Sequence, residues 1–360
     1  MQVLKQNFKK SHILIIGSGI IGKFNAVELS KQGFQITIAD PLKSLNSSSA
    51  ALGLLISNMY QKSKGRSWEL RKTSQKLWPK WINYLQKYNN RLKIEKPLIQ
   101  LTTDLTKFEK LNKFISNNPK RALEVLDKNS YIIQNINKVF NTDNLKGIIS
   151  YHDGRIDPIS LLNTLNTCLT YRKINFVSKE ILKIKKVNNK WISTCSNKLK
   201  IESDAIVLCN SLDAIKLIDV NLYDIKLKPV LGQALEISLN EKETNLLSLP
   251  KHFSINGKNF IPINKNKIII GSTDEYDTKP KENILEELTD FIQNKPKWLN
   301  KNNISNQWYG VRSRPEGEGS PILKSIEKGL ILCTGFYKNG ILLAPACSNW
   351  ISNEIENYHL

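Results

Sequence analysis

The chain has 360 residues, a formal net charge of +21 at pH 7 and no apolar run long enough to span a membrane. This length allows two domains and a large core. The first dozen residues lack the apolar core of a signal peptide, and residues 1–10 are expected to form a flexible N-terminal lead-in. The five cysteines have no paired spacing typical of zinc sites, so we expect no metal, free thiols and a cytoplasmic location.

The positive charge raises the question of nucleic-acid binding. The basic residues are scattered along the chain, and no cluster with interleaved aromatic residues forms a stripe. A solvated lysine surface therefore explains the charge better, and nucleic acid is not an expected partner.

Residues 11–40 predict a strand, a glycine-rich turn, a helix and a second strand that ends in Asp40. In the turn, the first glycine permits the tight bend, the second lets a pyrophosphate approach the backbone, and the third lets helix and strand pack closely. The helix N-terminus then faces the phosphates, and the carboxylate of Asp40 can accept hydrogen bonds from a ribose. This order predicts a dinucleotide site, with the turn reading Gly17-Ser18-Gly19-Ile20-Ile21-Gly22.

A small, hydroxyl-rich segment follows, at residues 46–55. Such small residues allow a phosphate or a bulky ring to approach closely, although an ordinary loop leading into the core would have the same sequence pattern. The candidate contacts in this segment are Ser48, Ser49, Ala50, Gly53 and Leu54.

The rest of the chain alternates between predicted helices and strands. Helices are expected at 66–89, 104–117, after Asp157-Pro158 and at 281–294. Strands are expected at 98–102, 148–151, 174–178, 181–187, 191–195, 205–209, 226–238, 259–263, 267–272 and 330–334. The fold class is therefore mixed α/β, with a second sheet inserted into a dinucleotide-binding domain.

Four segments in this order resemble the FAD-dependent D-amino-acid oxidase superfamily. They are the glycine-rich turn, Ser49-Ala50-Ala51-Leu52-Gly53-Leu54-Leu55, Pro229-Val230-Leu231-Gly232-Gln233, and the stretch from Thr334 to Pro345. The last is most similar to the glycine oxidase branch. The resemblance implies FAD rather than NAD. It also implies a discontinuous FAD-binding domain at 11–90, 146–222 and 305–360, and a substrate-binding domain at 91–145 and 223–304.

The C-terminal motif has a physical reading beside this resemblance. Asn339-Gly340 precedes an apolar segment with helical character, and a helix N-terminus can stabilise negative charge on a reduced flavin. The remaining expected FAD contacts are Gly335, Asn339, Gly340, Ile341 and Leu342.

The resemblance also implies a substrate site. Gly310-Val311-Arg312 is similar to the family's G-L-R, whose arginine binds the substrate carboxylate, and Arg314 competes for this role. A guanidinium group matches a carboxylate in two parallel hydrogen bonds. Lys338 replaces an arginine and Phe260 a tyrosine of the family pattern, so the substrate site is altered. None of the four histidines falls in these segments, so no histidine base is expected.

The expected activity is oxidation of the carbon–nitrogen bond of a small amino acid, with hydride transfer to FAD. Oxygen or another acceptor would reoxidise the flavin, and oxygen would yield hydrogen peroxide. Two alternatives stay open: an oxidase of a carboxymethylaminomethyl group on transfer RNA, and a flavin-binding protein with a degraded substrate site. The oligomeric state, a homo-oligomer included, is also open.

Overall fold

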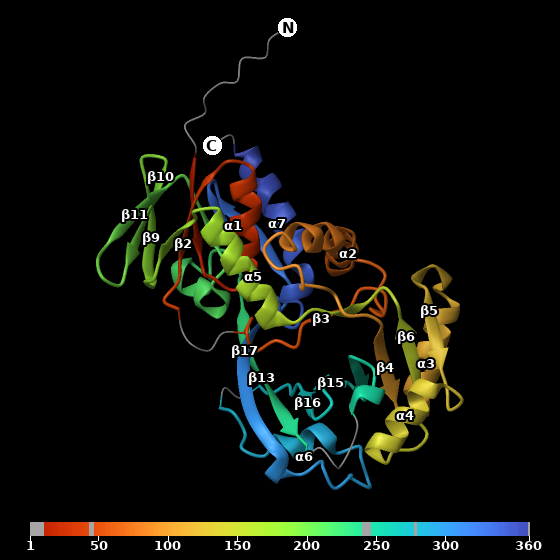
Figure 1. The fold of residues 1–360 in the computed structure, drawn as a ribbon. Coiled ribbons are helices and arrows are strands. Elements are labelled where there is room, and N and C mark those ends of the chain that lie inside the picture. Colours follow the sequence, from red (N-terminus) through yellow and green to blue (C-terminus); the bar gives the residue numbers. More distant parts are fainter. Residues whose placement is uncertain (1–10, 43–46, 240–245, 277–278, 359–360) are drawn as a thin grey trace.

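The computed structural model describes residues 11–42, 47–239, 246–276 and 279–358, which form two large sheets and two small ones with helices around them (Figure 1). The expected N-terminal lead-in at 1–10 lies outside the described residues. Within them, no helix combines the length and the apolar character that a membrane span requires.

A six-stranded sheet forms the centre of the first region. Five strands run parallel, in the order β19-β12-β1-β2-β8, and β18 adds an antiparallel edge. The short apolar runs of the four inner strands are buried on both faces, as expected for a parallel sheet. The strands are β1 (His12–Ile16), β2 (Gln35–Ala39), β8 (Asn175–Val177), β12 (Ala205–Leu208), β18 (Ile322–Glu327) and β19 (Leu330–Thr334).

Two different layers cover this sheet. Ile13 and Ile15 of β1 pack against helices, whereas Leu14 and Ile16 pack on the other face with Trp191 of a small antiparallel sheet. This alternation follows from the two-residue period of a strand. The helices are α1 (Ile20–Lys31), α2 (Arg66–Leu85), α5 (Pro158–Tyr171) and α7 (Gly340–Asn357), and the small sheet has β9 (Ile181–Val187), β10 (Lys190–Cys195) and β11 (Lys200–Ser203).

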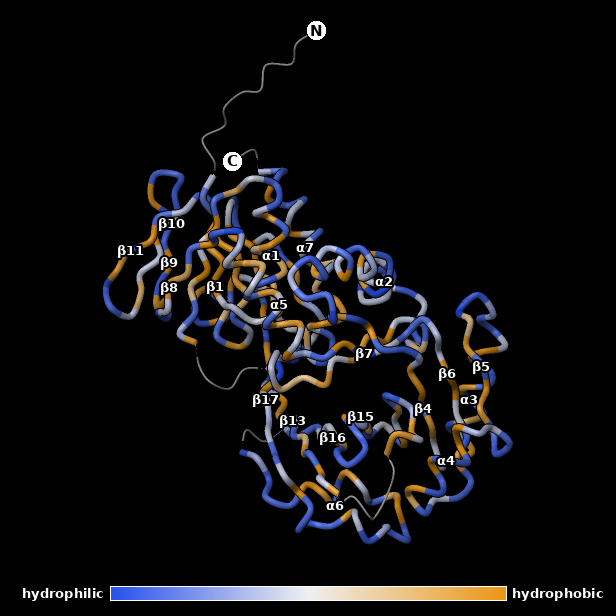
Figure 2. Tube along the Cα trace, in the orientation of Figure 1, coloured by the Kyte–Doolittle hydropathy of each residue, from blue (hydrophilic) through white to orange (hydrophobic). Residues whose placement is uncertain are grey.

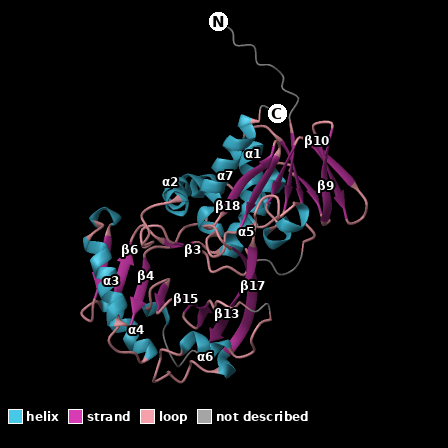
Figure 3. Ribbon diagram, turned by 180° about the vertical axis from the view of Figure 1, so that it is seen from behind, coloured by secondary structure: helices cyan, strands magenta, loops and turns pink. Residues whose placement is uncertain are grey.

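An eight-stranded mixed sheet forms the second region, best seen with the view from behind (Figure 3). Its order is β17-β13-β16-β15-β14-β4-β6-β5. One face packs against α4 and α6, and the other faces the first region. The elements are β4 (Leu98–Thr102), α3 (Leu105–Ser116), β5 (Leu123–Leu126), α4 (Tyr131–Phe140), β6 (Lys146–Ser150), β13 (Leu227–Ser238), β14 (Phe253–Ile255), β15 (Lys258–Asn264), β16 (Lys267–Gly271), α6 (Ile284–Thr289) and β17 (Ile304–Pro315).

Apolar residues follow the strands and inner helix faces of both regions, and hydrophilic residues gather on the outer loops (Figure 2). Between the two regions lies a two-stranded sheet of β3 (Leu54–Leu55) and β7 (Gly154–Arg155). Short 3₁₀ helices occupy Pro119–Arg121, Ser211–Leu217, Leu246–Ser248 and Lys301–Asn303.

Several elements of the structure were not expected from the sequence, among them β5, α4 and β18. Two further differences concern features that were expected. The helix expected at 281–294 ends at Thr289, because a turn follows in which the Ile292 amide donates to the Thr289 carbonyl. In addition, β6 and β17 lie in segments assigned to the FAD-binding domain but hydrogen-bond within the eight-stranded sheet. The division into domains otherwise stays a prediction.

Candidate functional site

A cavity of about 550 Å³ extends from the N-terminus of α1 to β17, between the two sheets. It brings together residues from both ends of the chain and from its middle. This size falls in the range of small-molecule and cofactor sites. The expected site residues that line it are Gly17, Ser18, Gly19, Ile20, Ile21, Asp40, Ser48, Ala50, Gly53, Leu54, Arg312, Lys338, Gly340 and Ile341.

The glycine-rich turn at one end of the cavity is set by backbone packing. Gly17 has φ +105°, and a Cβ there would lie 2.7 Å from the Cys209 backbone. Gly22 does not line the cavity, but a Cβ there would lie 1.9 Å from the Gly17 carbonyl oxygen. Glycine at both positions therefore lets α1 begin directly against β1.

Two side chains lie over the N-terminus of α1. Asp40, at the end of β2, accepts hydrogen bonds from the amides of Ser18 at 2.6 Å and Leu42 at 2.7 Å. Ser48 Oγ accepts from the Ile20 amide at 3.0 Å. The first turn of α1 itself contains no acidic residue.

The N-terminus of α7 forms a second wall. Gly340 and Ile341 line the cavity, and a Cβ on Gly340 would have no neighbour closer than 3.7 Å. The first turn of α7 also lacks an acidic residue. Besides Gly22, four expected FAD contacts do not line the cavity: Ser49, Gly335, Asn339 and Leu342.

Arg312 is held at the β17 end of the cavity, with its side chain 14% exposed. Its Nη1 donates to the Thr273 carbonyl at 3.1 Å and to Asp274 Oδ1 at 2.8 Å, and its Nη2 donates to Ser272 Oγ at 2.8 Å. Burial lowers the pKa of Arg312, and the nearby Asp274 carboxylate opposes this shift. The guanidinium group lies over Gly232, where a Cβ would be 2.0 Å from Nη2.

Asp274 joins the two cations at this end. Its Oδ2 pairs with Lys338 Nζ, its Oδ1 pairs with Arg312, and the Tyr337 hydroxyl donates to Oδ1 at 3.4 Å. Burial raises the pKa of Tyr337, with Asp274 adding to the shift. Two cations therefore share the Asp274 carboxylate, and the buried Glu275 places a second negative charge close to Arg312.

Phe260 does not reach the cavity. It is fully buried beneath the sheet, where its ring stacks on Phe253 and packs edge-on against Phe140. Alternation along β15 explains this difference from the expectation, because its neighbour Asn259 lines the cavity instead. Asn259 Oδ1 lies 3.3 Å from Nε2 of His252, whose pKa burial lowers to about 3.

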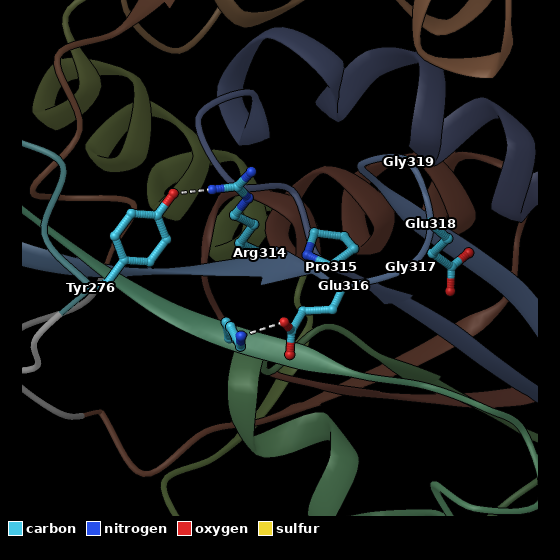
Figure 4. Close-up of a pocket in the computed structure, with 8 residues that line it drawn as sticks. Tyr276, Arg314, Pro315, Glu316, Gly317, Glu318 and Gly319 are labelled. Carbon is cyan, nitrogen blue, oxygen red and sulfur yellow. Dashed lines mark hydrogen bonds and ion pairs between the residues drawn. The ribbon is translucent and has the colours of Figure 1, made fainter.

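Arg314 lies outside the main cavity. It lines a separate cleft of about 540 Å³ with Lys228, Glu316 and Glu318, where its guanidinium group donates to the Tyr276 hydroxyl (Figure 4). Both arginines are on β17, but only Arg312 shares the cavity with the glycine-rich turn.

The five cysteines are free and buried, and Cys209 and Cys333 line the cavity. Burial raises the pKa of Cys333 well above its usual value. In the described part of the chain, no group of three or more His, Cys, Asp or Glu residues is placed to hold a metal ion.

Sequence reasoning did not identify several residues of the site. Alternation in β15 could have indicated Asn259, and Gly232 stood in a motif already noted. Ser272 and Asp274 had no local signal, because the pairing of β13 with β16 and β17 brings their segment to Arg312. Further lining residues not identified are Asn210, Ser211, Leu212, Tyr309, Thr334 and Tyr337.

Comparisons with known proteins were made on the sequence and on the fold. A family model described as FAD dependent oxidoreductase matches residues 12–354. No curated protein matched the sequence. Among solved structures, glycine oxidases from Bacillus cereus ATCC 14579 and Geobacillus kaustophilus each have a TM-score of 0.81 at 20% identity, over 97% of this chain and 95% of theirs. Iminodiacetate oxidase from Chelativorans sp. BNC1 has a TM-score of 0.80 at 17% identity, over 96% of this chain and 95% of its own.

Proposed function

Because the chain belongs to the FAD dependent oxidoreductase family, we propose that this enzyme oxidises the carbon–nitrogen bond of a small amino acid or an N-substituted glycine. The observation that carries the proposal is the buried Arg312, in the same cavity as the glycine-rich turn. The similar folds named as glycine oxidases and an iminodiacetate oxidase support this substrate class.

The residues of the cavity fit FAD. Gly17, Ser18 and Gly19 at the N-terminus of α1 suit the pyrophosphate, and Asp40 suits the adenosine ribose. Gly340 leaves open space beside the N-terminus of α7, which suits the ring. Bound FAD supplies the hydride acceptor for the reaction.

In this proposal, Arg312 binds the substrate carboxylate and Lys338 adds a second positive charge. A carboxylate held in two places fixes the α-carbon in one orientation, and alignment supplies much of the rate of a hydride transfer. The α-carbon loses a hydride and the nitrogen loses a proton, so that an imine forms. Water then hydrolyses the imine to an oxo acid and ammonia or an amine.

The test is an anaerobic titration of the FAD-loaded protein with glycine, sarcosine, D-alanine, D-proline and L-proline, followed by flavin absorbance. We expect at least one amino acid to bleach the flavin. Arg312→Ala should retain FAD, but its rate of flavin bleaching should fall by a factor of roughly 10² to 10³. This is the cost of removing one partner of a buried charge pair.

Arg314→Ala is the matched control, since Arg314 lies on the same strand but lines the other cleft. It should bleach at a rate within a few-fold of the unaltered protein. Loss of bleaching in Arg314→Ala alone would transfer the carboxylate-binding role to Arg314. A flavin that dithionite bleaches and no amino acid does would contradict the proposed substrate class, and would favour the transfer-RNA or non-catalytic alternative.

A further inference from the structure

Arg71 is a buried arginine that the sequence reasoning did not identify. It lies in α2 and is only 5% exposed. Its guanidinium group is 3.9 Å from the centre of the Tyr60 ring, and in the described part of the chain no ion pair joins it to an acidic residue. Its Nε is buried without a hydrogen-bond partner. Burial lowers the pKa of Arg71, and the buried Asp153 carboxylate opposes this shift only in part. A buried charge held without a direct ion pair is costly and is a reason to look for function.

The hydrogen bonds of Arg71 join two walls of the cavity. One Nη donates to the Ile56 carbonyl, directly after the segment whose residues 50–54 line the cavity. The other Nη donates to Asn339 Oδ1 at 2.7 Å. Arg71 therefore links Ile56, directly after the hydroxyl-rich segment, to Asn339, directly before α7.

The bond to Asn339 changes what that residue does. Asparagine at this position commonly accepts a hydrogen bond from an amide of the first helical turn. Here Asn339 makes no side-chain cap, and the first intrahelical bond runs from the Leu343 amide to the Asn339 carbonyl at 2.9 Å. Because Arg71 occupies the Asn339 oxygen, the amides of Ile341, which lines the cavity, and Leu342 are left without this cap.

Other side chains of α2 hold the same part of α7. Trp78 Nε1 donates to the Leu342 carbonyl at 3.0 Å, and Ser74 Oγ accepts from the Ala346 amide at 3.3 Å. With Arg71, these residues share one face of α2, at helical spacing. Only Arg71 among the three brings a charge, so its effect on a bound group is separable from simple packing.

We infer that Arg71 is a positioning residue of the flavin site, which keeps the N-terminus of α7 uncapped and places a positive charge behind it. Both effects stabilise negative charge in the cavity, and a reduced flavin is more negative than an oxidised one. Arg71 therefore favours the reduced form of the bound FAD. This inference rests on FAD binding and is independent of which substrate the enzyme oxidises.

The test measures the two-electron reduction potential of the bound FAD by dye equilibration, with a chemical reductant and no amino acid. In Arg71→Met, the equilibrium constant for reduction of the bound FAD should fall about tenfold. For a two-electron reduction this is a shift of about 30 mV to a more negative potential. Arg71→Lys keeps the charge and should recover most of this shift. A loss caused only by packing would not be recovered in this way.

Arg121→Met is the matched control. Arg121 is also a buried arginine and donates to carbonyls of the same segment, at Asn58 (3.1 Å) and Tyr60, but it makes no bond to α7. Its removal should lower the melting temperature without moving the potential. An unchanged potential in Arg71→Met, or an equal shift in Arg121→Met, would overturn the inference.

A second variant covers the case in which Arg71→Met does not fold or does not retain FAD. Asn339→Asp keeps an acceptor for Arg71 and nearly the same shape, but it neutralises the guanidinium charge beside α7. The reduction potential should again become more negative, because the equilibrium constant for reduction falls about tenfold. A potential within error of that of the unaltered protein would then refute the proposed role of Arg71.

Discussion

The two ends of the cavity are built from different parts of the polypeptide. At the α1 end, backbone groups and glycines form the wall, and a Cβ on Gly17 or Gly22 would collide with other backbone atoms. At the β17 end, side chains from separate strands form it, with Arg312 between Asp274, Ser272 and Gly232. The α1 end, which we propose as the cofactor end, therefore depends on chain geometry and tolerates little change. The β17 end, which we propose as the substrate end, depends on side chains that single substitutions can alter.

The largest expected effect is at the cofactor end. Gly22→Val should abolish FAD binding, because a Cβ would lie 1.9 Å from the Gly17 carbonyl oxygen and α1 would have to move. The measurement is bound FAD per protein, from the absorbance of the purified sample. Gly33→Ala is the control: it has φ +94° and no neighbour within 4 Å, so it should cost about 1 kcal/mol of stability and keep FAD. Equal FAD content in both variants would contradict the rigidity of this end.

Gly232→Ala tests the substrate end, where we expect activity to fall while FAD binding is retained. The added Cβ would meet the end of the flexible Arg312 side chain, so the chain should fold and bind FAD while the guanidinium group is displaced. A displacement of about 1 Å at a reacting centre can cost roughly 10²-fold, and we expect a loss of that order in kcat/KM. Gly319→Ala, which has open space around it, should leave kcat/KM unchanged. Full activity in Gly232→Ala would contradict the assignment of Arg312 to the substrate site.

His252 provides a pH test of the support beneath Asn259. Burial lowers its folded-state pKa to about 3, while the unfolded chain takes up a proton near pH 6.5. The folded protein therefore binds fewer protons between these values. Its free energy of unfolding should fall as pH falls, by about 1.4 kcal/mol per pH unit from this group. His252→Gln should flatten the slope between pH 6 and 4 in urea titrations. An unchanged slope would show that another group causes the acid sensitivity.

The smallest expected effect concerns Asp274. Asp274→Asn removes the negative charge that Arg312 and Lys338 share, so a carboxylate ligand has less competition for them. Acetate should bind severalfold more tightly, as judged by its perturbation of the flavin spectrum. Weaker binding would instead assign to Asp274 the main task of holding the two cations in place.

The sequence predicted the local geometry of the α1 end better than that of the β17 end for a physical reason. The turn from Gly17 to Gly22 and the start of α7 at Gly340 depend on residues close together in the chain, so a short motif carries the information. The wall around Arg312 depends on strand pairing, and Asp274 has no motif of its own. Phe260 shows what a match to a family motif leaves undetermined. The segment that contains it lies beside the cavity, but side chains alternate along β15, so the Phe260 ring points into the core and Asn259 points toward the cavity.

The buried thiols bear on the lifetime of the enzyme. If oxygen accepts the electrons, each turnover releases hydrogen peroxide within reach of Cys209 and Cys333, which line the cavity. Peroxide reacts with the thiolate, not with the protonated thiol. Because burial raises the pKa of Cys333, its sulfur stays protonated at neutral pH and resists oxidation. The packing that buries Cys333 thus also limits the oxidation of this thiol by peroxide.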